Sequence, residues 1–567
     1  MATDSEAPKR EATPTSAPSS LPQKRVLEDD HVPAVSSPLN PDFKSAKSQS
    51  QDENPAMARE KRTKKESLKK RESKGAPTGG DSARATPDPK QPQKKVKHAP
   101  PAEVSPMRYK LPPPKPGDFE EARGPVFVSH HEVQGPAGEE IEFFETTEHV
   151  YNKKNFVYTH CIADPGFPSS FYYRSTEPEP HGAHMSFEDA ATHMYFDKSG
   201  RHITTDKGFR MARANVAVRE GRWYWECKIT RGTLQEKPPA GSEQPDSHGH
   251  VRVGFARREA SVDAPVGFDA YSYGIRDVSG QKVHMSRPKD FFPPGEEIRE
   301  GDVLGLEIQL PSENLHRKVV QGNYNPAVDF VDEVSPNAEA PNIVRDRIPI
   351  RFKAHIYFEK IDYHTTKELD DLMNPSPMSS SGPVQSEPPN PNHPVPGLRT
   401  LPNSWIKVYK NGVLMGTAFD NLLVFLPPAS KPAAQQDARD GLDDGMVGYY
   451  PAVSVFRGGA AEVNFGPKFW YPPSGYTDGQ EDVEMTGQDD QPTNGQQPEG
   501  SSPGPSAISQ RYDEQIVEDI VYDIIDEVDF WMKDGARIID RTRRDEKIEA
   551  VGMTAGREEI KELVQDD

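Results

Sequence analysis

Short runs in which apolar and polar residues alternate recur through the middle of the chain. Residues 222–229 place Trp223, Trp225, Cys227 and Ile229 on one face and Tyr, Glu and Lys side chains on the other. The same period of two is found at Val251, Val253 and Phe255; at Leu304, Leu306, Ile308 and Leu310; at Phe352, Ala354, Ile356 and Phe358; and at Ile406, Val408, Val453, Val455, Val463 and Phe465. Such alternation is typical of half-buried strands. Many short strands with turns between them predict a mainly β protein, an antiparallel β-sandwich.

The connections between these runs agree with that fold class. The strand ending at Val408 leads into Lys410-Asn411-Gly412, and an Asn-Gly pair is a strong signal for a tight hairpin. Three segments rich in Pro, Gly or charge interrupt the pattern, at 234–247, 366–402 and 427–444. We expect them to be loop insertions at the surface, where extra length costs little free energy.

A helical period appears near the end of the chain, over residues 509–532. The aliphatic residues Val517, Val521, Ile524 and Val528 fall at i, i+4, i+7 and i+11, and Ile516, Ile520 and Ile525 widen that stripe. The opposite face carries Glu514, Glu518, Asp519, Asp523, Asp526 and Glu527 without a Lys or Arg among them. We expect the apolar face of this C-terminal amphipathic helix to dock on a partner. The alternative is that the helix packs back on its own domain.

Composition divides the chain into five segments. Only 33% of the 567 residues are hydrophobic and 57 are Pro, which indicates long disordered parts. We expect a disordered basic tail over 1–117, the β domain over 118–475, a disordered linker over 476–508, the helix over 509–532 and a charged tail over 533–567. Residues 118–205 are expected to add strands to the sandwich.

The net charge of −20 conceals a basic N-terminal segment. Residues 58–97 hold 14 Lys or Arg and 5 Asp or Glu, so this window is +9 and the rest of the chain is −29. Its cations include Lys61, Arg62, Lys64, Lys65, Lys69, Lys70 and Arg71. Such a window predicts a nuclear import signal, a contact with nucleosomal DNA, or a merely solvated run of charge. No apolar run is long enough for a membrane span and no secretory signal is visible, so we expect a soluble, intracellular protein. An import signal in the basic window would direct it to the nucleus.

The residues offer no catalytic or metal-binding constellation. The two cysteines, Cys161 and Cys227, cannot complete a zinc-finger pattern. His130-His131 and His181…His184 lack the further ligands that a metal site needs, and no phosphate loop, nucleophile elbow or zincin motif occurs. We therefore expect no metal, no cofactor and no enzymatic activity of its own.

Six short motifs, in this order, resemble the SPRY domain. They are Gly208-Phe-Arg-Met-Ala-Arg-Ala214, Gly221-Arg-Trp-Tyr-Trp-Glu226, Val251-Arg-Val-Gly-Phe255, Gly301-Asp-Val-Leu-Gly305, Val408-Tyr-Lys-Asn-Gly412 and Asn464-Phe-Gly-Pro467. Residues 264–276, Phe358-Glu359, Tyr450-Pro-Ala452 and the tail helix narrow the resemblance to the "absent, small or homeotic" SPRY subunit of COMPASS, a trithorax-type histone methyltransferase complex. The cysteine count and the polar N-terminus depart from animal members, which carry zinc-finger and winged-helix modules, so the chain is similar to a shorter, fungal-type member.

The resemblance implies a scaffold function and its partners. In that family the SPRY surface binds an acidic segment of a WD40 scaffold subunit, and the tail helix binds a small helical-dimer subunit. The assembly stimulates a SET-domain methyltransferase that modifies histone H3 at lysine four. By position in the motifs, the expected SPRY-surface residues are Phe209, Arg252, Pro265, Phe268 and Arg276. The expected helix residues are Val517, Ile520, Val521, Ile524 and Val528.

Two other functional classes remain open at this point. A SPRY substrate adaptor of a ubiquitin ligase or trafficking complex would share the sandwich, but the chain shows no RING or F-box module, and such an adaptor would not need the acidic helix. A nucleic-acid-binding regulator would require basic and aromatic residues on one sheet face, and the alternating runs show no such cluster. For Arg252 and Arg276 the simplest alternative is a solvated surface arginine, and for Phe209 and Phe268 it is ordinary core packing.

Overall fold

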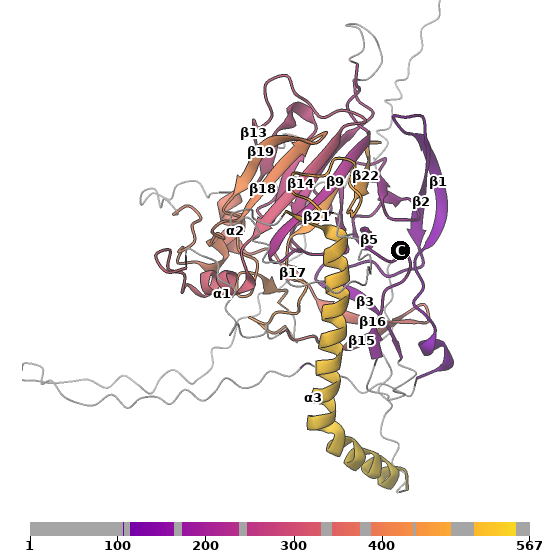
Figure 1. Ribbon diagram of the computed structural model, residues 1–567. Coiled ribbons are helices and arrows are strands. Elements are labelled where there is room, and N and C mark those ends of the chain that lie inside the picture. The colour runs from indigo at the N-terminus through magenta and orange to yellow at the C-terminus, as the bar shows by residue number, and fades with distance from the viewer. Residues whose placement is uncertain are drawn as a thin grey trace, which may run out of the picture.

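The computed structural model describes residues 106, 114–163, 173–236, 246–329, 343–374, 387–434, 438–477 and 504–550, with side chains of the last segment given through Val528 and at Met532. The basic window at 58–97, most of the linker expected at 476–508 and the chain after Ala550 lie outside the described residues. The described part is mainly β, and one long helix leaves it at the C-terminal end (Figure 1).

Two large sheets form the body of the fold. The larger sheet has the order β1 (Val126–Gln134), β2 (Glu140–Thr147), β6 (Tyr195–Phe196), β7 (His202–Thr204), β22 (Ala460–Asn464), β9 (Gly221–Arg231), β14 (Val303–Leu310), β18 (Trp405–Lys410) and β19 (Val413–Asp420). The second sheet has the order β13 (Arg287–Lys289), β12 (Lys282–His284), β11 (Ser272–Arg276), β10 (His250–Ala256), β21 (Tyr450–Phe456), β8 (Arg210–Ala214) and β5 (Met185–Ala190). Neighbouring strands along both paths are antiparallel, which confirms the predicted mainly β sandwich class.

The main core lies between these two sheets and uses the faces that alternation predicted. Trp225 and Ile229 of β9, Phe255 of β10 and Ile308 of β14 are all fully buried in one cluster. The rings of Trp225 and Phe255 meet edge to face across it, with centroids 6.1 Å apart. Burial of large apolar side chains from both sheets is the dominant favourable contribution to the stability of such a sandwich.

Of two turns, one was predicted from the sequence and the other was not. Asn411 and Gly412 have φ of 49° and 81° and join Lys410 to Val413, so the predicted tight hairpin is confirmed. The run at 352–358, read as one strand, is instead a hairpin. It joins β15 (Ile348–Phe352) to β16 (His355–Ile361) through Lys353 and Ala354, which both have positive φ. Neither turn residue is Gly or Asn, so the sequence carried no turn signal there.

A second, smaller core covers the outer face of the second sheet. Met211 and Ala452 on that face pack with Val266, Ala270 and other residues of the segment that precedes β11. The insertion at 366–402 contributes α2 (Lys367–Met373) and η3 (Pro396–Leu398) to this cluster through Leu369, Met373 and Leu398. The expectation of a purely surface loop is therefore wrong for these parts of the insertion, because their apolar residues cover a sheet face that would otherwise be wet.

The remaining elements lie around the sandwich. A four-stranded sheet has the order β15, β16, β3 (Phe156–Ala163) and β4 (Tyr173–Ser175), and β17 (Tyr363–His364) pairs with β20 (Lys431–Pro432). Short helices are η1 (Pro116–Phe119), η2 (Val278–Gly280) and α1 (Glu313–Gln321). The last elements are β23 (Ser506–Ala507) and α3 (Ile508–Ala550), and α3 runs past β3, β16 and β15 (Figure 1). No helix among the described residues combines the length and the apolar character of a membrane span.

The start of α3 is part of the sandwich. β23 pairs in parallel with the first residues of β9, and Ile508 is 0% exposed within the main core. Residues 504–508 therefore belong to the fold and not to the linker in which the expected boundaries placed them. The reason is local: Ala507 and Ile508 are small and aliphatic enough to fill a gap beside Phe465, whose carbonyl accepts the N–H of Ser509 at 2.9 Å.

Candidate protein-docking surfaces

The first candidate surface lies on the outer face of the second sheet. Val251, Val253 and Phe255 of β10 point into the core, so Arg252 points to the opposite face. β11 pairs with β10 in a register that sets Arg276 directly opposite Arg252. Directly opposed residues have Cβ atoms about 4.5–5.5 Å apart, so the structure brings together the two arginines that were expected to form one site.

The electrostatics of this pair favour an anion. Burial and, to a smaller extent, the neighbouring Arg276 lower the pKa of Arg252 to about 10, although Asp277 acts in the opposite direction. Within the described part of the chain neither guanidinium has an ion pair, and the carboxylate of the neighbouring Asp277 lies 3.0 Å from His250 Nδ1. Two adjacent cations with reduced hydration are stabilised by carboxylates, which guanidinium groups bind through paired hydrogen bonds.

Aromatic residues form one side of the surface. The guanidinium of Arg252 lies 4.7 Å from the centroid of the Phe209 ring, and that ring lies 4.7 Å from the ring of Phe456. Pro265 is partly exposed on the segment that covers the sheet. Phe268 is only 7% exposed and so offers little surface in this conformation. This agrees with the simpler reading of Phe268 as a packing residue.

Sequence reasoning missed two members of this surface. His250 and Phe456 are paired across β10 and β21, and their rings lie 6.0 Å apart beside Arg252. A hydrogen bond that Asp277 accepts raises the pKa of His250, although burial opposes the change. The available signal was their alternation with the buried residues Val251 and Val455, which places both side chains on the face of Arg252.

The second candidate surface is the apolar face of α3. Its aliphatic residues are exposed over about four helical turns: Ile516, Val517, Ile520, Val521, Ile524, Ile525 and Val528. Val517 is the most open of them, at 60%. An exposed aliphatic stripe of this length is typical of an interaction site. All five helix residues expected to dock on a partner lie in this stripe.

The acidic face of α3 is turned toward the rest of the chain. Arg345 Nη1 lies 2.5 Å from Asp519 Oδ1, and Arg347 Nη2 lies 2.6 Å from Asp523 Oδ1. Tyr512 donates a hydrogen bond to Glu177 at 2.6 Å. The helix thus does pack on its own domain, but through its polar side. From the sequence, the apolar side was the one expected to be covered. The structure combines both alternatives, because the acidic side packs on the domain and the apolar side stays available for a partner.

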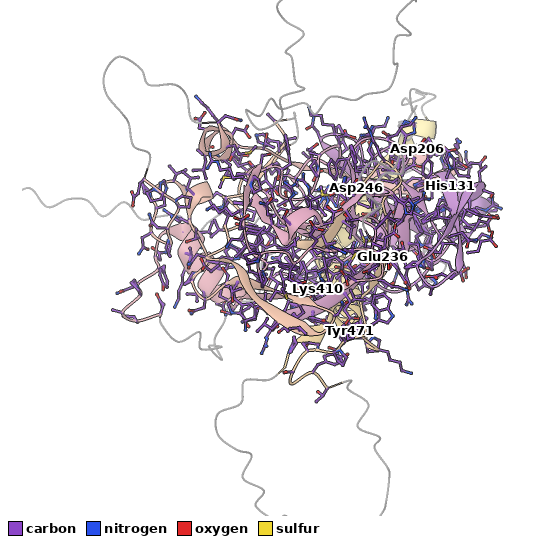
Figure 2. The ribbon with its side chains drawn as sticks, turned by 90° about the horizontal axis from the view of Figure 1, so that it is seen from above. His131, Asp206, Glu236, Asp246, Lys410 and Tyr471 are labelled. Atoms are coloured by element: carbon purple, nitrogen blue, oxygen red, sulfur yellow. The ribbon has the colours of Figure 1, made fainter. Side chains whose placement is uncertain are left out.

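The other candidate groups are structural. His130 and His131 pack on Tyr195 and Phe143, and Figure 2 shows His131 at the β1–β2 end, away from Lys410 and Tyr471. Both cysteines are free and buried, and burial raises the pKa of each thiol. Among the residues that the structure describes, no cluster of His, Cys, Asp and Glu is arranged to hold a metal ion.

Comparison with known proteins identifies the family. The chain is 66% identical to "COMPASS component cclA" of Colletotrichum higginsianum, over 100% of both chains. The chain belongs to the family of Ash2-type COMPASS components. This confirms the resemblance drawn from the SPRY motifs and the tail helix.

More distant relatives align with a smaller share of this chain or of their own length. "Set1 complex component ash2" of Schizosaccharomyces pombe is 34% identical over 90% of this chain and 60% of its own. "COMPASS component BRE2" of Saccharomyces cerevisiae is 26% identical over 71% of this chain and 93% of its own. A human SPRY domain structure matches at a TM-score of 0.22 and 12% identity, over 49% of this chain and 98% of that one. No family model matches the chain.

Proposed function

We propose that this chain is a non-catalytic scaffold subunit of a COMPASS-type complex in the nucleus. In this proposal it stimulates the methylation of histone H3 at lysine four by a separate SET-domain subunit. The names of its relatives, which are components of COMPASS and Set1 complexes, support membership in such an assembly. The observation that carries the proposal is the exposed aliphatic face of α3, because a scaffold needs a surface that is complete only when a partner covers it.

The proposed partner of α3 is a small subunit that dimerises through helices. The stripe is regular, aliphatic and free of charge, which suits a groove between two helices. Each large aliphatic side chain that becomes buried contributes roughly 1.5–3 kcal/mol. The acidic side chains from Asp519 to Glu527 are already paired within the chain, so the partner would be held by apolar contacts.

The proposed ligand of the Arg252–Arg276 surface is an acidic segment of a WD40 scaffold subunit. Two half-buried cations side by side disfavour a basic ligand and select one with closely spaced carboxylates. The Phe209 and Phe456 rings beside them suit an apolar residue next to those carboxylates. With both surfaces occupied, the chain would hold two partners at fixed positions and so order the catalytic subunit.

The basic window at 58–97 completes the proposal as an import signal, with nucleosomal DNA as a possible contact. Binding to DNA through phosphates weakens steeply with salt. Salt-insensitive nucleosome binding would show that this window is not the contact. No membrane partner is proposed, since interfacial helices carry Lys or Arg on the polar face and α3 carries acids there.

The deciding experiment is Val521→Asp in the full tagged chain. A charge in the centre of the stripe should abolish co-purification of the small helical-dimer subunit, because a buried unpaired carboxylate costs several kcal/mol. Val413→Asp is the matched control, since Val413 is also exposed, at 65% against 47% for Val521, but lies on the β18–β19 hairpin. Mass spectrometry of material purified from nuclear extract provides the readout.

The same purification separates the competing functions. Recovery of a SET-domain methyltransferase, a WD40 scaffold and the small dimer by the wild type and by Val413→Asp supports the scaffold proposal. Retention of the small dimer by Val521→Asp would contradict it. Recovery of cullin or other ubiquitin-ligase components would favour the substrate-adaptor alternative and leave the fold unchanged.

A further inference from the structure

The acidic face of α3 is held by arginines that the domain supplies from an extended segment. Arg345 and Arg347 precede β15 at alternate positions and so reach the helix on the same side. Arg347 bridges two acids one turn apart, with Nη2 2.6 Å from Asp523 and Nε 3.1 Å from Asp526. The guanidinium of Arg345 also lies 4.8 Å from the ring centroid of Tyr522.

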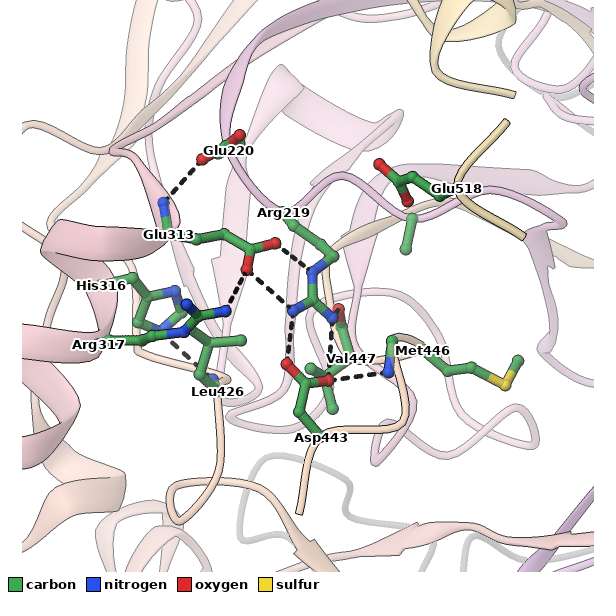
Figure 3. Close-up of polar contacts among 12 residues, drawn as sticks. Arg219, Glu220, Glu313, His316, Arg317, Leu426, Asp443, Met446, Val447 and Glu518 are labelled. Atoms are coloured by element: carbon green, nitrogen blue, oxygen red, sulfur yellow. Dashed lines mark hydrogen bonds and ion pairs between the residues drawn. The ribbon is translucent and has the colours of Figure 1, made fainter. Parts of the chain in front are cut away.

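Figure 3 shows a charge network around the buried Arg219, and Asp443 of that network holds this segment. The N–H of Val344 donates to the carbonyl of Asp443 at 2.8 Å. The carboxylate of Asp443 lies 2.6 Å from Arg219 Nη2, and Arg219 Nε lies 2.6 Å from Glu313 at the start of α1. Arg219 stands just before β9, so the position of the two arginines is set by the core of the fold.

These cations stabilise the helix, because its acidic residues repel one another. Asp519 and Asp523 are four residues apart, as are Glu514 and Glu518, and like charges at this spacing destabilise a helix. Arg511 offsets the repulsion between Glu514 and Glu518, with Nη1 3.2 Å from the first and 2.7 Å from the second. Further along, Asp519, Asp523, Asp526 and Glu527 pair with Arg345, Arg347 and Arg174, which all lie outside the helix. The aliphatic face contributes little within the chain, because its side chains are 37–60% exposed.

We propose that Arg345 and Arg347 are positioning residues, which keep α3 folded and turn its aliphatic face outward before any partner binds. The described acids from Asp519 to Glu527 are paired within the chain, so a partner reads only the aliphatic face. The partner also avoids the entropy of ordering a free segment. This last consequence rests on the proposed function, whereas the positioning of the helix does not.

Hydrogen exchange on the full chain without partners tests the positioning. Arg345→Asp should raise the exchange rate of amides 516–528 about tenfold, while amides of β9 and β14 keep their protection. Lys318→Asp is the matched control, because it reverses a charge that pairs with Asp329 in an exposed loop. The swap of Arg345→Asp with Asp519→Arg should restore most of the protection, which a merely structural role of Arg345 would not predict.

Arg347→Gln is the second variant, since it removes the bridge without adding a charge beside the four-stranded sheet. It should also raise exchange in 516–528. The proposal is overturned if both single variants exchange like the wild type, or if the swap exchanges as fast as Arg345→Asp. Binding of the small helical-dimer subunit is measured separately, and about tenfold weaker binding by Arg345→Asp is expected. If Arg345→Asp exchanges faster but the wild type does not bind the small helical-dimer subunit, the proposed function is contradicted. The positioning of α3 by the two arginines would still stand.

Discussion

A half-buried arginine next to a second one is unfavourable until an anion reaches both. The sequence placed Arg252 off the core face by alternation, and the register of β10 with β11 then set Arg276 beside it. Burial and that neighbour lower the pKa of Arg252 to about 10, so its charge is a cost to the isolated domain. An arginine whose charge is disfavoured in the isolated domain is better explained by binding to a ligand than by a contribution to stability.

Arg252→Gln should separate the two explanations. We expect affinity for an Asp- and Glu-rich probe peptide to fall on the order of 30-fold, roughly 2 kcal/mol, because the peptide loses a charged hydrogen-bond partner. The unfolding temperature should stay the same or rise, since a disfavoured charge is removed. Fluorescence anisotropy and thermal unfolding measure the two quantities. Lys289→Gln, on exposed β13 of the same sheet, is the control, and equal peptide binding by both variants would contradict the site.

At the scale of elements, periodicity predicted the type of secondary structure better than the position of each element in the fold. The helical period near the C-terminus predicted α3, and the structure shows that its first residues fill the main core while its acids pair with the domain. The alternation of Phe352, Ala354, Ile356 and Phe358 was equally regular but folds as a hairpin. A period of two cannot distinguish one strand from two strands joined by a tight turn when the turn lacks Gly, Asn or Asp.

Two substitutions within α3 test how the helix is attached. Ile508→Ala should destabilise the domain by about 2–5 kcal/mol, because Ile508 is fully buried and its removal leaves a cavity. Ile520→Ala makes the same change at an exposed position of the same helix and should cost less than about 0.5 kcal/mol. Urea unfolding of the full chain measures both. Similar losses for the two variants would show that the attachment at Ile508 is not as described.

At the scale of the whole molecule, the described residues on either side of 478–503 lie close together. Gly504 approaches Gly475 so closely that a Cβ on Gly504 would meet the Gly475 carbonyl oxygen, and Ser506 already pairs with β9. The position of α3 is therefore set by the sandwich on one side and by Arg345 and Arg347 on the other. The length of the linker does not set it.

Shortening the linker should have little effect on the fold. With residues 478–503 replaced by a Gly/Ser loop of about four residues, we expect the unfolding temperature and the co-purification of partners to be retained, since loop length contributes only weakly to stability. Differential scanning fluorimetry and the purification described above provide the readouts. Loss of the small helical-dimer subunit from an otherwise folded variant would show that the linker itself takes part in docking.

The sequence by itself determined the fold class, the core faces of the strands, the Asn-Gly hairpin and the aliphatic stripe of α3. Each of these depends on residues close together in the chain, where side-chain period and turn chemistry act directly. The six SPRY motifs and the tail helix were also enough to recognise the family, which whole-chain identity then confirmed.

Only the tertiary structure decided which charges meet. Arg345 and Arg347 gave no signal in the sequence, because they become partners of Asp519, Asp523 and Asp526 only after the segment before β15 is fixed by Asp443 and Arg219. The same holds for Phe456 and His250 beside Arg252, which strand pairing brings together across the sheet. Ion pairs and cross-strand contacts depend on distances between remote residues, and local patterns do not encode those distances.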